Sequence, residues 1–304
     1  MQLHSTTPTL VSVLTEWIER RLPKLVLAPT TLAMLVFVYG FILWTTWISF
    51  TKSQLLPNYD FAGFLQYTKL FANERWWVAC KNLVIFGGLF IFICILLGLL
   101  LAILLDQRIR MEGFLRAVYL YPMALSFIVT GTAWKWMLNP SLGLERLVQQ
   151  MGFSSFTFDW LVNPKMSIYT VVIAAVWQSS GFVMALFLAG LRGIDSSIIK
   201  AAQVDGASLP RIYLRIIIPS LRPVFFSAVI ILSHIAIKSF DLVIALTSGG
   251  PGYSSDLPAT FMYAFAFNRN RLGLGAASAM MMFFTVMAIV VPYLYSELRS
   301  KRHA

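Results

Sequence analysis

Three titratable side chains, His234, Lys238 and Asp241, fall at positions i, i+4 and i+7 within one apolar stretch of the sequence. On a continuous helix this spacing places all three on one face, where Lys238 and Asp241 can pair across one turn. An unpaired charge in hydrocarbon costs at least ~2.5–3.5 kcal/mol on insertion scales, so the face should point at protein or at water. The pattern leaves three functions open: a polar seam between helices, a face lining a solute pathway, and a proton relay or intramembrane enzyme.

A second polar group interrupts an apolar run at Trp177–Phe182 (Trp-Gln-Ser-Ser-Gly-Phe). Sugars are held by aromatic rings that stack on their C–H faces and by hydrogen bonds to their hydroxyls, as a few polar groups in an apolar lining. The segment offers both kinds of contact through Trp177, Gln178, Ser179 and Phe182. Ordinary helix packing would explain the two aromatic residues equally well.

The remaining reactive side chains form no recognisable site. Cys80 and Cys94 have no zinc-type spacing, and the histidines are His4, His234 and His303. We expect both cysteines to be buried structural residues and expect no metal site. The sequence contains no GxxxxGK[ST] phosphate loop, so the chain is expected to bind neither ATP nor another cofactor itself.

The elements that position these residues are expected to be membrane helices. Of 304 residues, 58% are hydrophobic and 12% charged, whereas soluble domains are about a quarter charged. So large an apolar surface must meet lipid. The net charge of +11 does not indicate a nucleic-acid partner, because the basic residues stand in short clusters beside apolar spans, as membrane orientation requires.

A hydrocarbon core about 30 Å thick is crossed by roughly 20 apolar residues in a helix. The sequence therefore predicts an all-α polytopic membrane protein with six transmembrane helices in one domain, residues 25–295. The predicted spans are Leu25–Phe50, Leu83–Leu105, Ala117–Leu138, Ser167–Leu191, Val224–Leu246 and Leu272–Tyr295.

The orientation follows from the distribution of Lys and Arg. They are in excess on the side that holds both termini and the 192–223 connection, which predicts that this side is cytoplasmic. The first connection on the other side is nevertheless basic, with Lys52, Lys69, Arg75 and Lys81.

The two terminal segments are also assigned from composition. Residues 1–24 lack the pattern of a signal peptide. Hydrophobic residues at helical spacing predict an amphipathic cytoplasmic segment there, namely Leu14, Trp17, Ile18 and Leu22. Residues 296–304 are expected to form a basic cytoplasmic tail.

The 192–223 connection is predicted to contain a short helix, a break and a second short helix. We expect Asp205 to cap the second helix, Gly206 to supply the backbone angles of the break, and Pro210 to lie in the first turn. Pro219 and Pro223 should end that helix before the next span. Hydrophobic residues at 3.6-residue spacing then give the loop an exposed apolar face that requires a partner protein: Leu209, Ile212, Tyr213, Ile216 and Ile217.

This connection resembles the coupling loop of ABC import permeases, whose pattern is Glu-Ala-Ala, three residues, Gly, and then a spaced Ile and Leu-Pro. The matching residues are Ala201, Ala202, Asp205, Gly206, Ala207, Ile216 and Pro219. Ile218 replaces the usual Leu, and Lys200 replaces the usual Glu. If that Glu normally meets a basic residue of the ATPase, the contact here is absent, water-mediated or reversed in sign.

Two further passages resemble the sugar branch of the same family, the maltose and glycerol-phosphate type. They are Leu246–Pro251, which ends in Gly-Gly-Pro and precedes Ala264-Phe265, and Trp134–Gly143. The Gly-Gly-Pro signature is similar to that of one of the two permease subunits in such transporters. Within that branch the chain is similar to bacterial glucose/mannose importers.

The resemblance implies a type I ABC importer permease fold and a transport subunit that is not an enzyme, in a bacterial cytoplasmic membrane. The implied partners are membrane lipid, a sugar or sugar-like solute, a second related permease that completes a heterodimer, two ATP-binding subunits that hold ATP and Mg, and a periplasmic or extracellular solute-binding protein. ATPase closure would pull on the 192–223 loop and rock the helices around a mid-membrane cavity.

The resemblance also assigns residues. It places ATPase coupling at the matching residues above together with Leu209 and Ile212. It places the solute pathway at Trp177, Gln178, Ser179 and Phe182, then near Lys238 and Ser239, with Asp241 beside them. The residues alone leave a self-sufficient secondary transporter and an intramembrane enzyme as alternatives. The first is expected to carry a coupling-ion site and the second a nucleophile–base cluster.

Overall fold

The computed structural model describes residues 10–107 and 109–300 of the chain. Within these ranges the fold is helical, and the only strand-like pairing is an isolated bridge between Thr51 and Phe61. The elements are α1 (Leu10–Met34), η1 (Leu35–Tyr39), α2 (Gly40–Ser49), α3 (Leu65–Phe71), α4 (Glu74–Asp106), α5 (Glu112–Leu120), η2 (Tyr121–Ala124), α6 (Phe127–Met137), α7 (Leu144–Gln150), α8 (Ser167–Arg192), α9 (Ser196–Val204), α10 (Leu209–Ile212), η3 (Tyr213–Ile217), α11 (Ile218–Ser220), α12 (Arg222–Ile237), α13 (Asp241–Leu246), α14 (Pro258–Tyr263), η4 (Ala264–Asn268) and α15 (Leu272–Ser300).

Apolar helices long enough to cross a membrane dominate this arrangement. Four are unbroken: Arg21–Ser49, Glu74–Asp106, Ser167–Arg192 and Leu272–Tyr293. Two further candidates are bent pairs, the α5–η2 segment with α6 and the α10–α11 segment with α12. If each bent pair counts as one crossing, the described chain has six. The predicted all-α polytopic class is confirmed.

The predicted third span, Ala117–Leu138, is wrong as one straight helix. The chain bends by 99° between η2 and α6. Pro122 lies in η2, and its carbonyl accepts from the Leu125 N–H at 3.2 Å. The Ser126 side chain then caps α6 by accepting from the Val129 N–H at 3.3 Å. A proline and a capping serine are ordinary helix-end signals, which the hydropathy of this stretch masked.

The backbone is continuous across both predicted boundaries of the membrane domain. α1 begins at Leu10 and contains Pro23 and Pro29, so the helix runs through residue 24. α15 likewise runs through residue 296 and ends at Ser300. Residues 1–9 and 301–304, with His4 and His303, lie outside the described residues. The amphipathic segment and the basic tail stay predictions.

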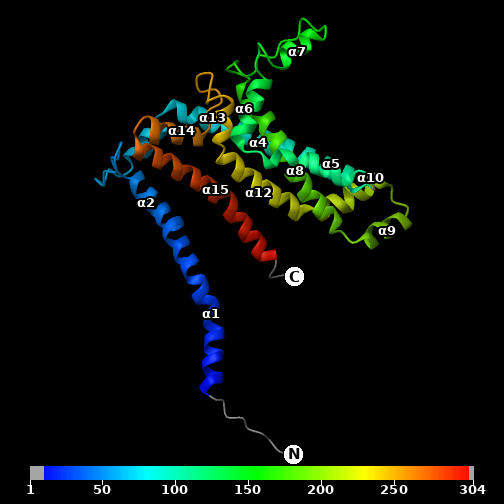
Figure 1. The fold of residues 1–304 in the computed structure, drawn as a ribbon, viewed down its shortest axis with the longest axis horizontal. Coiled ribbons are helices and arrows are strands. Elements are labelled where there is room, and N and C mark those ends of the chain that lie inside the picture. Colours follow the sequence, from blue (N-terminus) through cyan, green and yellow to red (C-terminus); the bar gives the residue numbers. More distant parts are fainter. Residues whose placement is uncertain (1–9, 108, 301–304) are drawn as a thin grey trace, which may run out of the picture.

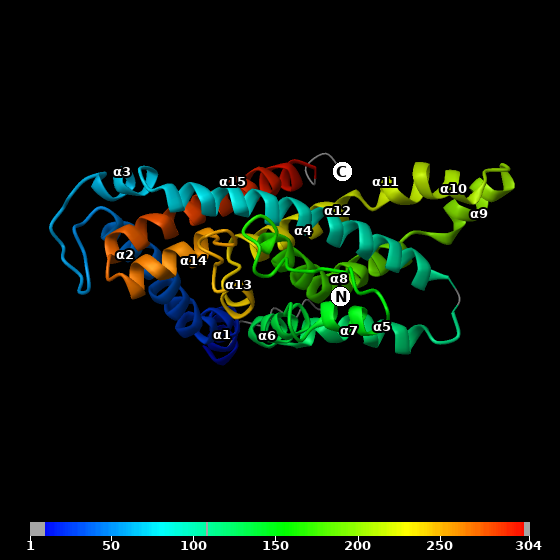
Figure 2. The same cartoon turned by 90° about the horizontal axis from the view of Figure 1, so that it is seen from above.

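The core lies where α4 crosses α8 (Figure 2). A Cβ on Gly98 of α4 would lie 2.6 Å from Cγ1 of Val183 in α8, so a residue without a side chain is needed for this close approach. α6 packs on α13 in the same way, because a Cβ on Gly131 would lie 2.6 Å from Cβ of Ala245. Large buried side chains fill the centre, among them Phe86, Phe90 and Phe187. Cys94 is buried there, as predicted, whereas Cys80 is half-buried.

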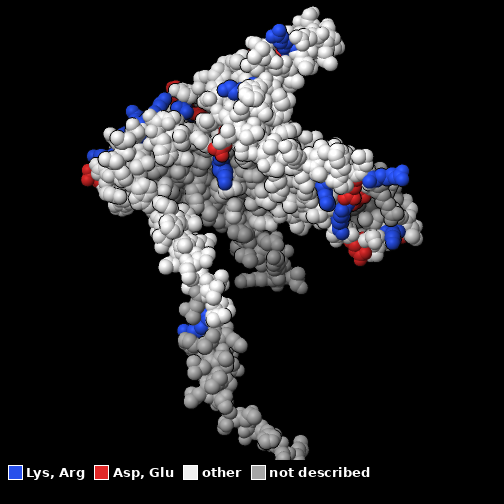
Figure 3. All heavy atoms as spheres, in the orientation of Figure 1, with Lys and Arg blue, Asp and Glu red and all other residues white. Residues whose placement is uncertain are grey.

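The surface separates into apolar and charged regions. α1 leaves the body as an arm (Figure 1), and the most apolar part of the Arg21–Ser49 span is 0% buried within the chain. Charged side chains gather at the two ends of the body, one of which carries α9 and α10 (Figure 3). The face between them shows few charges, as expected of a body whose middle meets lipid or protein.

Candidate functional site

The Trp177–Phe182 segment lies within α8, and its side chains differ in exposure. Trp177 is 40% exposed and meets Trp134 of α6 edge-on, with 6.0 Å between ring centroids. Ser179 is buried, and Phe182 is half-buried against the helical core. Trp177 is therefore the residue of this segment with the most exposed aromatic surface.

Gln178, next to it, already has a partner within the chain. The side chain is 4% exposed, and its Nε2 donates to the Leu125 carbonyl oxygen at 2.8 Å. In a continuous helix that carbonyl would accept from the Val129 N–H, but Ser126 takes this donor instead. Gln178 thus satisfies the carbonyl that the bend before α6 sets free. Its Oε1 atom is buried without a hydrogen-bond partner among the described residues.

Gly181 allows the same two elements to touch. A Cβ at this position would collide with the carbonyl oxygen of Tyr119 in α5. The polar segment of α8 is therefore, in part, a packing surface for the bent third span. Hydropathy alone gave no indication of this contact.

The predicted common face of His234, Lys238 and Asp241 is wrong, because the helix does not continue through it. α12 ends at Ile237 and α13 begins at Asp241. All three titratable side chains are exposed within this chain, and no ion pair joins Lys238 to Asp241 in the part that the structure describes. Ser239, between them, is half-buried.

The break gives Lys238 and Asp241 a different electrostatic setting. Lys238 is the C-terminal cap of α12, where carbonyl groups are unpaired, and Asp241 occupies the first turn of α13, where amide groups are unpaired. Each charge therefore has the sign that the adjacent helix end favours. This interaction makes two exposed charges tolerable at a break inside an apolar segment.

The two candidate pathway groups are connected through α6. Trp134 of α6 contacts Trp177 of α8, and Gly131 of α6 packs against Ala245 of α13. The structure thus brings α6, α8 and α13 together.

The 192–223 connection is an ordered pair of short helices. Asp195 caps α9, with its Oδ1 accepting from the Ser197 N–H at 2.8 Å, and hydrogen bonds from Ser197 lower the pKa of this carboxyl. α9 ends at Val204, and after the cap residue Asp205 comes Gly206, whose φ of +76° is the left-handed conformation that favours glycine. The amides of Gly206 and Ala207 donate back to the carbonyls of Gln203 and Ala202 at 3.0 Å. These two hydrogen bonds together form a Schellman C-cap.

The predicted role of Asp205 as the cap of the second helix is wrong. Asp205 is the C-terminal cap residue of α9, and the second helix is preceded by Ser208. Pro210 lies in the first turn of α10, as predicted. Pro219 and Pro223 stand on either side of Leu221, where the chain bends by 61° into α12.

The apolar face of the loop exists, but it points inward rather than at a partner. Ile212 and Ile217 are 1% and 5% exposed and belong to the main core, while Tyr213 and Ile216 are half-buried against it. The large apolar side chains of the loop that remain exposed are Val204 at 88%, Leu214 at 67%, Leu209 at 60% and Ile198 at 50%. Ala201 and Lys200 are exposed beside them, whereas Ala202 and Ala207 are half-buried. The periodicity identified which residues share a face but not its direction.

The base of the loop is tied to the neighbouring helices by charges that the sequence did not single out. Arg192, at the end of α8, donates from Nη2 to Glu112 Oε1 at 2.6 Å, and its Nε lies 3.9 Å from Asp106 Oδ1. Gln107 donates to the Tyr213 hydroxyl at 3.3 Å. These contacts link the loop to the end of α4 and the start of α5.

At the opposite end of the body, side chains of α4 hold the Gly-Gly-Pro loop between α13 and α14 by hydrogen bonds. Arg75 Nε donates to Asp256 Oδ2 at 2.6 Å, and Asp256 is 1% exposed. The Asn82 side-chain amide donates to the carbonyls of Tyr253, Ser254 and Asp256. Gly249, at φ +83°, passes close to Asp256, because a Cβ would lie 3.2 Å from Oδ1. The sequence pattern marked this loop but missed the side chains that anchor it.

The chain matches the family model described as "Binding-protein-dependent transport system inner membrane component" over residues 94–301. It therefore belongs to this family and is a membrane-embedded permease component of a binding-protein-dependent transport system. The family predicted from the coupling loop is confirmed, and membership decides against a self-sufficient secondary transporter and an intramembrane enzyme.

Curated relatives match nearly the whole chain. The xylose/arabinose import permease protein XacH of Haloferax volcanii is 39% identical over 87% of this chain and 84% of its own length. The trehalose/maltose transport system permease protein MalF of Thermococcus litoralis is 31% identical over 91% of this chain and 93% of its own length. A chain of a bacterial ABC transporter for alginate import has the same fold, with a TM-score of 0.80 over 95% of this chain and 98% of that chain, at 22% identity.

Proposed function

We propose that this chain forms half of the membrane pathway of an ATP-driven importer for a sugar or sugar-like solute. XacH is named for xylose and arabinose, and MalF is named for trehalose and maltose. Both names support a carbohydrate as the solute. Their solutes differ in size, so the likeness supports the class of solute and not one sugar.

The partners belong to the same proposal. A second, related permease would complete a heterodimer, a solute-binding protein would deliver the cargo, and two separate ATP-binding subunits would hold ATP and Mg. The absence of a phosphate-loop motif from the sequence supports this division. The arm formed by α1 and α2 exposes many apolar side chains between Leu22 and Trp47, which suits burial in lipid or against the second permease.

The 192–223 loop is proposed as the coupling element, on the cytoplasmic side with both termini. One observation carries this proposal: the loop presents Val204, Leu209 and Leu214 to solvent on a backbone fixed by the Schellman cap at Gly206. A rigid platform with exposed apolar side chains can transmit the movement of a docked ATPase to α8 and α12. Lys200 beside them would meet an acidic or neutral surface of the ATPase.

The solute is proposed to pass along α8 and the α12–α13 break, with Trp177 as the stacking surface. Lys238, Ser239 and Asp241 would line the same pathway, and the break between α12 and α13 leaves backbone groups available for hydrogen bonds there. The other three residues of the segment would support the pathway without contacting the solute, because their side chains pack within the chain: Gln178, Ser179 and Phe182.

Reconstitution tests this function directly. The chain is co-expressed with the neighbouring permease, ATPase and binding-protein genes, and the purified complex is placed in liposomes. We expect ATP-dependent accumulation of a sugar that also stimulates ATP hydrolysis. Uptake that proceeds without an ATPase subunit, or a complex that accumulates no carbohydrate from a broad panel, would contradict the proposal.

A further inference from the structure

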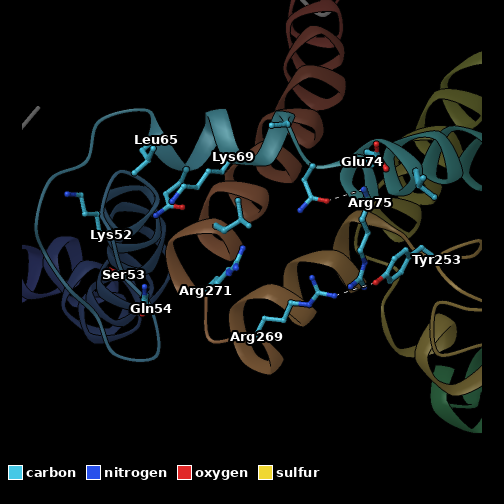
Figure 4. A pocket seen from close by; sticks show the side chains of 15 residues that line it. Lys52, Ser53, Gln54, Leu65, Lys69, Glu74, Arg75, Tyr253, Arg269 and Arg271 are labelled. Atoms are coloured by element: carbon cyan, nitrogen blue, oxygen red, sulfur yellow. Dashed lines mark hydrogen bonds between the residues drawn. The ribbon is translucent and has the colours of Figure 1, made fainter.

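An open cavity of about 1120 Å³ (Figure 4) lies beside α3, at the end of the body opposite α9 and α10 of the 192–223 loop (Figure 2). Its walls come from the 52–54 segment, α3, the start of α4, the Gly-Gly-Pro loop and the 269–271 turn. The charged residues in this lining are Lys52, Lys69, Glu74, Arg75, Arg269 and Arg271. We call it the basic cavity, since five of these six side chains are cationic.

Most of this positive charge has no counter-charge within the chain. Arg75 is the exception, because it pairs with buried Asp256. The other four cations are exposed, and no carboxylate of the described residues forms an ion pair with any of them. Arg269 instead donates to the Tyr253 hydroxyl at 3.4 Å and lies over the Phe265 ring.

The cations are carried on a backbone that is cross-linked by hydrogen bonds. The Gly273 N–H, at the start of α15 just after the 269–271 turn, donates to the Ser53 carbonyl at 2.9 Å and so joins α15 to the 52–54 segment. Gln66 of α3 donates to the Thr51 carbonyl at 2.7 Å, which joins α3 to the same segment. The scaffold therefore holds like charges together before any partner arrives, and a preorganised surface binds with less loss of conformational entropy.

Membrane orientation does not account for this arrangement. The cavity lies on the side predicted to be external, where the distribution of Lys and Arg opposes basic residues rather than favouring them. Interfacial anchors are also expected to spread around the rim of the spans, whereas these side chains line one hollow. Cations outnumber Glu74, the one carboxylate in this lining, and a hollow with an excess of one sign of charge attracts ligands of the opposite sign.

We propose that the basic cavity is the docking site for acidic side chains of the solute-binding protein. This inference rests on the proposed function, which supplies both the external orientation and the partner. A binding protein must engage this side of the permease, and the four unpaired cations call for carboxylates on the surface that approaches. The cavity is open to solvent, so side chains projecting from a protein surface can enter it.

Docking here would bear directly on the solute pathway. Arg75 and Tyr253 line the basic cavity, and Tyr253 belongs to the Gly-Gly-Pro loop that connects α13 to α14. The Arg75–Asp256 pair transmits a displacement of this wall to the same loop. A binding protein seated on the cations therefore contacts the loop that leads to the α12–α13 break.

The test uses the assembled transporter in nanodiscs of zwitterionic lipid together with its own binding protein. The dissociation constant is measured at a series of ionic strengths for wild type and for Lys69→Glu combined with Arg271→Glu. We expect the double variant to bind about tenfold more weakly or worse at low salt and to lose most of the salt dependence. Lys165→Glu, which reverses an exposed charge on the same side outside the basic cavity, is the matched control.

Milder variants distinguish a loss of docking from misfolding of the permease. Lys69→Gln with Arg271→Gln should weaken binding in the same direction by a smaller factor, with ATPase co-purification unchanged. Reversal of acidic residues on the binding protein should restore affinity to the Lys69→Glu, Arg271→Glu complex.

Three results would overturn the inference. Affinity could be unaffected by the double variant, or the control could weaken it equally. Binding could also change only when anionic lipid is added to the nanodiscs, which would assign the cavity to a lipid headgroup. If instead docking behaves as expected but no carbohydrate is taken up, the docking site stands and the proposed solute class fails.

Discussion

The Gln178 amide nitrogen lies 2.8 Å from the Leu125 carbonyl oxygen, and this bond joins α8 to the bend of the third span. The neighbouring residue, Trp177, is 40% exposed and has no such role. Two adjacent positions of one candidate solute segment therefore have separable functions. Gln178 stabilises the bend before α6, while Trp177 keeps an exposed aromatic surface, which its proposed role in solute stacking requires.

Gln178→Leu is expected to destabilise the complex. The change removes the donor to a buried carbonyl, and an unsatisfied buried polar group costs about 1–3 kcal/mol. The measurement is the thermal unfolding midpoint of the purified complex. Gln107→Leu serves as the control, because the Gln107 amide makes only long, exposed hydrogen bonds. Wild-type stability accompanied by altered solute selectivity would show that Gln178 contacts the solute instead.

Trp177→Ala is expected to reduce uptake while the complex assembles normally. The change removes an indole that is 40% exposed and that meets the Trp134 ring edge-on. Trp177→Phe should retain part of the uptake, because an aromatic surface remains. The measurements are initial uptake rate and the yield of assembled complex. Loss of assembly in Trp177→Ala would support the packing alternative.

Gly206 should tolerate asparagine far better than valine. Nothing lies within 4 Å of a Cβ at this position, so space does not limit the substitution. The cost is conformational, because φ is +76° and β-branched residues are strongly disfavoured there, while asparagine visits this region. We expect Gly206→Val to retain membrane insertion but to weaken ATPase association and uptake, with Gly206→Asn close to wild type. Equal transport by wild type, Gly206→Val and Gly206→Asn would show that this loop does not couple the ATPase to transport.

Asp195 and Asp205, at the two ends of α9, are expected to differ in their contribution to the stability of this helix. Asp195→Ala removes a side-chain acceptor and is expected to destabilise the start of this helix. Asp205→Ala should have little effect, because no side-chain cap bond from Asp205 is found among the described residues. ATPase co-purified per permease is the measurement, and a larger loss for Asp205→Ala would contradict the observed caps.

The sequence predicted the apolar spans and the coupling loop because both depend on local patterns. Six long apolar runs are unavoidable in a chain with 58% hydrophobic residues, and Gly206 follows from the need for a positive φ at a break. The bend at Pro122 and Ser126 was also readable, since both are helix-end residues. It was missed because uniform hydropathy across Ala117–Leu138 gave the appearance of one helix.

Other features had no local signal. The break between Ile237 and Asp241 contains neither proline nor glycine to mark it, and the helix that follows, α13, packs on α6, which is far away in the sequence. The direction of the Ile212 face depends on the core it meets, which periodicity does not contain. Arg75 and Asp256 are 181 positions apart, and a pair at that separation becomes visible only when the helices are assembled.

The surface that docks the ATPase is predicted to be Val204, Leu209 and Leu214. Val204→Asp with Leu214→Asp should abolish ATPase co-purification, because charged groups would replace exposed apolar contacts at the interface. Thermal stability of the permease pair should stay near wild type, since both side chains are exposed. Ile212→Ser should do the opposite and lower stability, because it puts a polar group into the core. An Asp double variant that binds ATPase normally would place the interface elsewhere.

The Arg75–Asp256 pair is expected to stabilise the Gly-Gly-Pro loop and with it the outer end of the pathway. Asp256 is 1% exposed and Arg75 is largely buried, and Asp256 also accepts from the Thr260 hydroxyl. Removing one partner of a buried ion pair typically costs about 3–5 kcal/mol, because the remaining charge is left buried without compensation. Asp256→Asn should therefore lower the unfolding midpoint strongly, while Asp60→Asn, on an exposed carboxylate, should not. Replacing both partners, as Arg75→Met with Asp256→Leu, should recover part of the stability because neither charge then remains. If the double replacement restores stability but not uptake, the pair acts in transport as well as in folding. A midpoint that Asp256→Asn leaves unchanged would show that the three Asn82 hydrogen bonds alone hold the loop.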